Sequence, residues 1–241
     1  MAKVALVTGA NKGIGFETAR LLGKKGYTVW LGARDEARGK KAAETLKKEN
    51  FDVRFISLDV TNEASVKAAA ERVEAETGAL DVLINNAGIY LADKDGEASV
   101  TSLETVREVY EVNVFGAMRV TQKFVPLLKK AKHSSIVMVS SGLGSVTWQA
   151  DLTSGMSTVK AISYNSSKSA LNGIAIGFAN ELRESGIKVN CVNPGYNATD
   201  LNDHAGTHPP THGAALVVQA AFLGEAGPTG VFVDEKGTCP W

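Results

Sequence analysis

A tyrosine and a lysine four residues apart are the side chains of this sequence best placed to move a proton. Tyr164 and Lys168 stand in a segment with a helical pattern, where a spacing of four puts both on one face. A phenol donates a proton with an ordinary pKa of about 10, and we expect the neighbouring ammonium to lower that value by stabilising the phenolate. Such a pair also arises by chance, so a binding site beside it must support the interpretation.

The first fifteen residues predict a binding site for a dinucleotide. An apolar run at 4–7 precedes the glycine-rich stretch T-G-A-N-K-G-I-G at 8–15, and a helical pattern follows. Gly9 permits the tight turn, Gly13 lets the backbone approach a diphosphate, and Gly15 lets the helix pack on the strand. An ordinary glycine-rich turn is the alternative. The cofactor-binding residues predicted in this turn are Gly9, Asn11, Lys12, Gly13, Ile14 and Gly15.

Short apolar runs alternate with longer amphipathic patterns along the chain, which is typical of βαβ units. Strands are predicted near residues 3–8, 28–31, 53–58, 81–85, 135–140, 187–193 and 231–233. Helices are predicted near residues 14–26, 36–50, 63–78, 103–131, 161–185 and 211–223. We therefore expect a single α/β domain over residues 1–241, Rossmann-type and doubly wound. Its seven-stranded sheet is mainly parallel, carries helices on both faces and forms the cofactor crevice at the carboxyl ends of the strands.

The end of the second strand bears on the choice between NAD and NADP. A carboxylate about 20 residues beyond the glycine turn holds the ribose hydroxyls of NAD, whereas the 2′-phosphate of NADP needs a cation there. Arg34 stands near that position, Asp35 follows it, and Lys12 adds a second cation. These charges favour NADP, because a guanidinium binds phosphate through two hydrogen bonds. The alternative is that both are solvated surface charges.

Other predicted cofactor contacts lie where further strands end. Asp59, with Val60 after it, follows the third strand and could bind an adenine amino group or equally cap the next helix. Small residues follow the fourth strand, and a proline and a glycine follow the sixth, where the backbone can approach the cofactor closely. These small residues are Asn86, Ala87, Gly88, Pro194 and Gly195.

Four motifs in order make the sequence similar to the short-chain dehydrogenase/reductase family over nearly its whole length. They are T-G-x-x-x-G-x-G at 8–15, N-N-A-G at 85–88, Tyr-x-x-x-Lys at 164–168 and N-P-G at 193–195. The glycine turn, the Gly-Ala-Arg strand end at 32–34 and the tail at 230–236 most resemble the NADPH-dependent carbonyl reductases.

The resemblance implies roles for four further groups. Ser141 is the expected hydrogen-bond donor to a substrate carbonyl oxygen, and Asn113 the asparagine that supports a proton relay beside Lys168. Lys168 also holds the nicotinamide ribose, and Thr199 bonds the nicotinamide amide or the diphosphate. The implied catalytic set is Asn113, Ser141, Tyr164 and Lys168, of which Tyr164 and Lys168 also contact the cofactor.

The substrate side of the predicted site is built from less regular segments. Residues 143–161 contain an insertion relative to the short form of the family, and residues 196–212, with a glycine and paired prolines, predict a mobile lid. Ser141, Tyr164 and Trp148 are the predicted substrate contacts. Trp148, Met156, Tyr90 and Leu143 could form an apolar wall or belong to the core. Because the longer insertion of similar reductases tends to cover the tetramer interface, we expect a monomer rather than a homo-tetramer.

Three histidines recur every four residues, at positions 204, 208 and 212, which on a helix would resemble a metal site. Pro209 and Pro210 lie between the second and third and interrupt the helix that this argument requires. We therefore predict no bound metal.

Composition narrows the class of protein. The chain has 241 residues, 44% of them hydrophobic and 22% charged, which excludes a disordered or fibrous protein. Its 26 basic residues balance 26 acidic ones, so neither nucleic acid nor an anionic membrane is an expected partner. The sequence has no apolar run long enough for a signal peptide or a membrane span, and its two cysteines predict no disulfide. These features predict a cytoplasmic protein.

Together the patterns predict an NADPH-dependent reductase of ketones or aldehydes, with Tyr164 as the general acid. An alcohol or steroid dehydrogenase of the same fold is the enzymatic alternative, which Arg34 and Lys12 disfavour. A non-catalytic NADP-binding sensor or scaffold is the alternative of another class, and such a protein could dispense with Tyr164 and Lys168.

Overall fold

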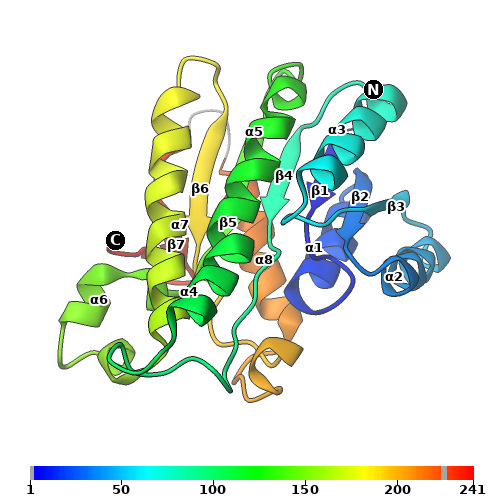
Figure 1. Cartoon of the computed structure of the whole chain (residues 1–241). Helices are drawn as coiled ribbons and strands as arrows, with labels where there is room; N and C mark the ends of the chain where they lie inside the picture. The colour runs from blue at the N-terminus through cyan, green and yellow to red at the C-terminus, as the bar shows by residue number, and fades with distance from the viewer. Residues whose placement is uncertain (1–2, 224–226) are drawn as a thin grey trace.

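A computed structural model describes residues 3–223 and 227–241 and contains one eight-stranded sheet (Figure 1). The order across the sheet is β3-β2-β1-β4-β5-β6-β7-β8, with every pair parallel except β7 and β8. The strands are β1 (Val4–Val7), β2 (Thr28–Ala33), β3 (Val53–Ser57), β4 (Val82–Asn85), β5 (Ser135–Val139), β6 (Lys188–Val192), β7 (Phe232–Asp234) and β8 (Gly237–Thr238). The strand order reverses between β1 and β4, and in such sheets this switch point is where a nucleotide binds.

Helices cover both faces of the sheet. The α-helices are α1 (Gly13–Lys24), α2 (Glu36–Lys48), α3 (Glu63–Thr77), α4 (Leu103–Tyr110), α5 (Ala117–Leu128), α6 (Val146–Ala150), α7 (Ile162–Glu181) and α8 (Pro210–Ala221). One hydrophobic core lies between the sheet and α3, α5 and α7, which face the viewer in Figure 1. A second core lies between the opposite face and α1, α2 and α8.

The central strands are mostly apolar because both of their faces are buried. β1 and β5 are buried at every residue, and Trp30 of β2 is the largest fully buried side chain. The strands point toward the lower edge of the molecule in Figure 1, so their carboxyl ends and the first turns of the helices meet there. This edge carries the residues for which the sequence predicts chemistry.

The predicted doubly wound α/β fold is confirmed, with two differences. β8 is a two-residue antiparallel addition at the edge of the sheet, too short for an alternation pattern to reveal. The single helix predicted over 103–131 is divided into α4, a π-helical segment (Glu111–Gly116) and α5. None of the helices in the described ranges has the length and hydrophobicity of a membrane span.

Candidate active site

The glycine turn between β1 and α1 has the backbone geometry that the sequence predicted. Gly9 and Gly13 adopt positive φ angles of 62° and 59°, a region that side chains other than glycine rarely enter. A Cβ atom at Gly9 would lie 2.9 Å from the Cα of Ala87, so the turn packs directly on the segment after β4. A Cβ atom at Gly15 would collide with the side-chain nitrogen of Asn86 and lie 2.7 Å from the Gly9 oxygen.

Thr8 and Asn86 fix this turn to the end of β4. The hydroxyl of Thr8 accepts the N–H groups of Asn86 at 3.0 Å and Ala87 at 2.9 Å. The side chain of Asn86 donates to the carbonyl oxygens of Thr8 at 2.9 Å and Gly9 at 3.1 Å. Asn86 was predicted as a cofactor contact, and its side chain here supports the turn. Sequence analysis missed Thr8, although its position directly before Gly9 could have pointed to it.

Tyr164 and Lys168 lie one turn apart on α7 and face the carboxyl ends of the strands. The Nζ atom of Lys168 lies 5.6 Å from the centre of the Tyr164 ring and donates a 2.8 Å hydrogen bond to the carbonyl oxygen of Val139. Lys168 is buried. A Cβ atom at Gly88 would lie 3.6 Å from that Nζ, which places the N-N-A-G segment beside the ammonium. The segments that carry the phenol, the ammonium and the glycine turn therefore adjoin at one edge of the sheet.

The expected lowering of the Tyr164 pKa is wrong for this structure. Burial raises the pKa of Tyr164 to about 12, and a hydrogen bond with Ser141 opposes this rise. Burial also lowers the pKa of Lys168 to about 8, an effect that the nearby Cys191 thiol group counteracts. Loss of hydration, which disfavours the charged form of each group, is the largest cause of both pKa shifts.

The π-helical segment places Asn113 against the start of the loop that follows β4. Its side chain accepts the N–H of Ile89 at 2.8 Å and donates to the Ile89 oxygen at 3.0 Å and to the Ser167 hydroxyl at 3.0 Å. A Cβ atom at Gly88 would lie 3.3 Å from the Asn113 oxygen. Asn113 thus connects the N-N-A-G segment to α7, and π-helical segments of this kind occur frequently at functional sites.

Ser141 follows β5 and joins Tyr164 through a hydrogen bond. The next residue, Gly142, is surrounded by the insertion, since a Cβ atom there would lie 3.2 Å from Met156 and 3.4 Å from Trp148. On the other side, the Tyr90 ring lies 5.4 Å from the Tyr164 ring. The N–H of the fourth predicted wall residue, Leu143, donates to the Ser141 hydroxyl at 3.2 Å, so all four lie beside Ser141 or Tyr164. Trp148 also packs against the hydrophobic core, so this side chain can belong both to the apolar wall and to the core.

The opposite end of the predicted crevice is a cationic hollow beside α1 and α2. A cavity of about 310 Å³ is lined by Asn11, Lys12, Phe16, Arg38, Lys41, Ala42, Thr45 and Asp200. Arg34 is exposed at the end of β2. Asp35 is turned to the start of α2, where its carboxylate accepts the N–H of Arg38 at 2.9 Å. Sequence analysis missed Arg38 and Lys41, which lie on the face of α2 that borders the glycine turn.

Lys12 is already paired in the structure. Its Nζ atom lies 2.5 Å from a carboxylate oxygen of Asp200, on the loop after β6. Thr199 of the same loop lies over the turn, because a Cβ atom at Gly13 would be 3.5 Å from its methyl group. Lys12 is therefore less available to a phosphate than the sequence suggested.

Asp59 does not cap α3, which removes one of its two predicted roles. Its carboxylate accepts the N–H and the hydroxyl of Thr61 at 3.0 and 2.7 Å, while Asn62 caps the helix by accepting from Ser65. Val60 is buried against Gly116, and its carbonyl oxygen accepts from Arg119 at 2.6 Å.

The loop after β6 is organised by a buried asparagine. Asn197 donates to the carbonyl oxygens of Pro194 at 2.7 Å and Gly195 at 3.0 Å, and its own side-chain oxygen accepts the N–H of Gly213 at 2.9 Å. Gly206 packs against the Asn197 main chain so closely that any side chain would collide with it. Asn197 thereby fixes the segment from Pro194 to the start of α8, and sequence analysis missed it.

The three histidines do not converge. His204 lies 3.2 Å from Asp200, whereas the His208 and His212 rings stack 4.3 Å apart and His212 lies 3.3 Å from Glu235. Within residues 3–223 and 227–241, no group of three metal-binding side chains comes together.

The carboxyl edge of the sheet fits a dinucleotide. The turn at the start of α1 has positive φ angles at Gly9 and Gly13 and packs tightly at Gly9 and Gly15, the cationic hollow beside it suits a phosphate, and the buried ammonium of Lys168 lies at the other end. A model of the short chain dehydrogenase family matches residues 3–209. The chain belongs to the short-chain dehydrogenase family. It is accordingly an oxidoreductase of a family that uses a nicotinamide cofactor.

Individual members of the short-chain dehydrogenase family resemble the chain over nearly its full length. "Short-chain dehydrogenase anuI" of Penicillium roqueforti is 36% identical, with 98% of this chain and 95% of the relative covered. A (+)-neomenthol dehydrogenase of Capsicum annuum is 31% identical, with 97% and 96% covered. The crystal structure of an NADPH-bound carbonyl reductase from chicken fatty liver matches with a TM-score of 0.87 at 29% identity, covering 100% of this chain and 99% of that one.

Proposed function

We propose that the protein catalyses the NADPH-dependent reduction of ketones or aldehydes to alcohols. The observation that carries this proposal is the arrangement around Tyr164, whose phenol bonds Ser141 while the Lys168 ammonium lies 5.6 Å from its ring. A carbonyl oxygen that gains negative charge needs both a hydrogen-bond donor and a proton. Ser141 can supply the hydrogen bond and Tyr164 the proton.

Each residue of the proposed active site has its own role in the reduction. Nicotinamide, when bound, supplies a hydride to the carbonyl carbon. Ser141 donates a hydrogen bond to the carbonyl oxygen, and Tyr164, still protonated at neutral pH with a pKa of about 12, gives up its proton there. Lys168 holds the ribose hydroxyls and, as a cation, stabilises the phenolate that remains. Asn113 holds the Ile89 main chain and Ser167 in place beside Lys168. We assign to this region the relay that returns a proton to Tyr164.

The choice of NADPH rests on the charges beside α1 and α2. Lys12, Arg38 and Lys41 line the hollow, and Asp35 is engaged with the start of α2 and with Arg38. The side chain of Arg34 forms no ion pair with any residue that the structure describes, so its guanidinium is available to a 2′-phosphate. The NADPH-bound carbonyl reductase from chicken fatty liver has the same overall fold.

The remaining predicted contacts are proposed on the same basis. We assign the diphosphate to the glycine turn and Thr199, the adenine to Asp59 and Val60, and the nicotinamide end to Ala87, Gly88, Pro194 and Gly195. Trp148, Met156 and Tyr90 form an apolar wall beside the reacting oxygen, which suits a bulky or aromatic carbonyl compound. We also assign the lid to residues 196–212, whose two ends Asn197 links by hydrogen bonds to Pro194 and Gly213.

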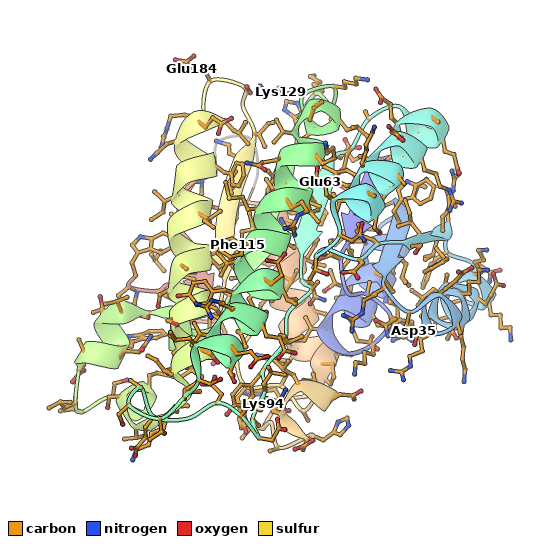
Figure 2. All side chains as sticks on the ribbon, viewed as in Figure 1. Asp35, Glu63, Lys94, Phe115, Lys129 and Glu184 are labelled. Carbon is orange, nitrogen blue, oxygen red and sulfur yellow. The ribbon has the colours of Figure 1, made fainter. Side chains whose placement is uncertain are left out.

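We also propose that the protein is a monomer. The insertion folds into α6 and short turns beside the start of α7 (Figure 1), and Thr147 is bonded to the main-chain oxygen of Trp241 at 2.9 Å. The exposed Phe115 on the outer surface of the adjoining helices (Figure 2) is a side chain that the alternative, a tetramer, could bury. Light scattering after size exclusion at micromolar concentration tests the proposal, and a tetrameric mass would contradict it.

A panel of aldehydes and ketones tests the function. Oxidation of NADPH, followed at 340 nm, is expected for bulky or aromatic carbonyl compounds, with kcat/KM at least about tenfold higher than for NADH. Turnover confined to alcohols and NADP⁺ would indicate a dehydrogenase. Binding of NADPH without any turnover would favour the sensor or scaffold alternative.

A further inference from the structure

The helix that carries Tyr164 and Lys168 begins at a residue that cannot cap it. α7 follows Ala161, which is buried and has a methyl side chain that can accept no hydrogen bond. Ser163, in the first turn, is also buried. The first N–H groups of a helix have no partner inside the helix, so buried ones need acceptors from elsewhere. For α7 these acceptors come from a distant part of the chain.

Asp95, in the loop between β4 and α4, supplies them. One of its carboxylate oxygens accepts the N–H of Ser163 at 3.0 Å, and the other accepts the N–H of Tyr164 at 3.0 Å. The carbonyl oxygen of the next residue, Gly96, accepts the N–H of Ile162 at 3.0 Å. Three consecutive N–H groups at the start of α7 are thus bonded to two adjacent residues of one loop.

The loop is shaped to present this carboxylate. The N–H of Gly96 bonds both the Asp95 carboxylate and the Thr101 hydroxyl at 3.0 Å, and the N–H of Asp95 itself bonds the Leu91 oxygen at 2.8 Å. An ion pair between Glu97 and Lys160 joins the loop to the residues just before α7. Figure 2 labels Lys94, the neighbour of Asp95, where the loop passes along the lower edge of the molecule.

The same loop is held at its other end by a residue of the candidate active site. Asn113 exchanges two hydrogen bonds with the main chain of Ile89, and the next residue, Tyr90, lies with its ring 5.4 Å from that of Tyr164. The segment 89–95 therefore runs from Asn113 to the N–H of Tyr164. It connects the π-helical segment to the first turn of α7.

We propose that Asp95 is a positioning residue of the reaction, which sets the place of the Tyr164 phenol by capping α7 across 69 positions of sequence. A carboxylate suits this task, because its two oxygens serve two N–H groups and its charge complements the positive end of the helix. Asparagine would keep one acceptor and lose the charge, and alanine would lose both. The consequence for catalysis rests on the proposed function.

Two variants and a matched control test the kinetic consequence. Asp95→Asn is expected to lower kcat about tenfold and Asp95→Ala about a hundredfold. A displacement of the Tyr164 phenol by about 1 Å would account for a loss of about a hundredfold. The dissociation constant of NADPH is expected to stay within about twofold, because the phosphate contacts lie on the glycine turn and α2, and Lys168 lies one helical turn beyond the capped N–H groups. The control is Asp93→Asn. Asp93 is exposed two residues earlier, and its carboxylate bonds no residue of the described chain.

Hydrogen exchange followed by mass spectrometry tests the capping without any turnover. In Asp95→Asn the peptide containing residues 162–164 is expected to exchange faster than in the wild type, while peptides from 171–181 of α7 keep their protection. Wild-type kcat and wild-type protection in Asp95→Asn would overturn the proposal. An equal loss of kcat, NADPH affinity and protection along the whole of α7 would also overturn it, since that result indicates global destabilisation. If the wild type reduces no carbonyl compound, the proposed function fails, and the exchange data alone decide whether Asp95 fixes the helix.

Discussion

The Nζ atom of Lys168 lies 5.6 Å from the centre of the Tyr164 ring and donates to the carbonyl oxygen of Val139. At the carboxyl edge of the sheet Lys168 is buried and Tyr164 is partly buried. Burial moves their pKa values in opposite directions, to about 12 for the phenol and about 8 for the ammonium. At neutral pH the pair therefore holds both protons, as a proton donor with a cationic neighbour requires.

The lowered pKa of Lys168 predicts a specific dependence of stability on pH. Its pKa falls from 10.5 to about 8 on folding, so between these values the unfolded chain binds the proton and the folded chain does not. Unfolding then takes up a proton, and the contribution of Lys168 to the free energy of unfolding rises with pH through this window. Below pH 8 the buried charge costs on the order of 3 kcal/mol.

Urea unfolding of Lys168→Met between pH 7 and 10.5 measures this contribution. The variant is expected to be the more stable protein at pH 7, and its advantage over wild type should shrink by on the order of 3 kcal/mol by pH 10.5. Lys129→Met, an exposed lysine after α5 (Figure 2), is the control and should show a difference independent of pH. If the difference in free energy of unfolding between Lys168→Met and wild type did not change with pH, the Lys168 ammonium would not be desolvated in the folded protein.

Arg34→Asp is expected to reverse the choice of cofactor. The substitution places a carboxylate where NAD needs one and repels a 2′-phosphate, so the ratio of kcat/KM for NADPH to that for NADH should fall at least about a hundredfold. Arg183→Asp, just after the carboxyl end of α7, is the matched charge change and should leave the ratio unaltered. If the ratio of kcat/KM for NADPH to that for NADH were unchanged in Arg34→Asp, Arg34 would be a solvated surface charge without a role in cofactor binding.

Gly15→Ala is expected to destabilise the protein and to weaken NADPH binding. The added methyl group would lie 2.7 Å from the Gly9 oxygen and collide with the side chain of Asn86, at a cost of about 1–3 kcal/mol. In Gly173→Ala, on the exposed face of α7, the added methyl meets no atom of the described residues within 4 Å outside its chain neighbours and the backbone of α7 itself. That variant should gain about 0.5–1 kcal/mol in urea unfolding, because alanine is the better helix former. If Gly15→Ala and Gly173→Ala changed the free energy of unfolding equally, the close packing of Gly15 against Asn86 and Gly9 would be contradicted.

The sequence predicted the elements because buried parallel strands and amphipathic helices each have a periodic pattern. It could not predict the π-helical segment, since that depends on the packing of Gly116 against Val60 and on the bonds of Asn113 to a distant loop. Asp95 lies in a polar loop without periodicity, and the alanine before α7 was the one local sign that a cap must come from elsewhere. The pKa of Tyr164 was misjudged for a related reason, because sequence spacing gives proximity to an ammonium but not the loss of hydration.

Tyr164→Phe tests the account most directly, with Tyr110→Phe on α4 as the matched loss of a hydroxyl group outside the site. Wild type, Tyr164→Phe and Tyr110→Phe are compared in kcat/KM for the best carbonyl substrate at pH 7, together with the dissociation constant of NADPH. We expect Tyr164→Phe to lose a factor of about 10²–10⁴ in kcat/KM while still binding NADPH, and Tyr110→Phe to resemble wild type. A Tyr164→Phe variant that reduced the substrate as fast as wild type would contradict the assignment of the proton donor.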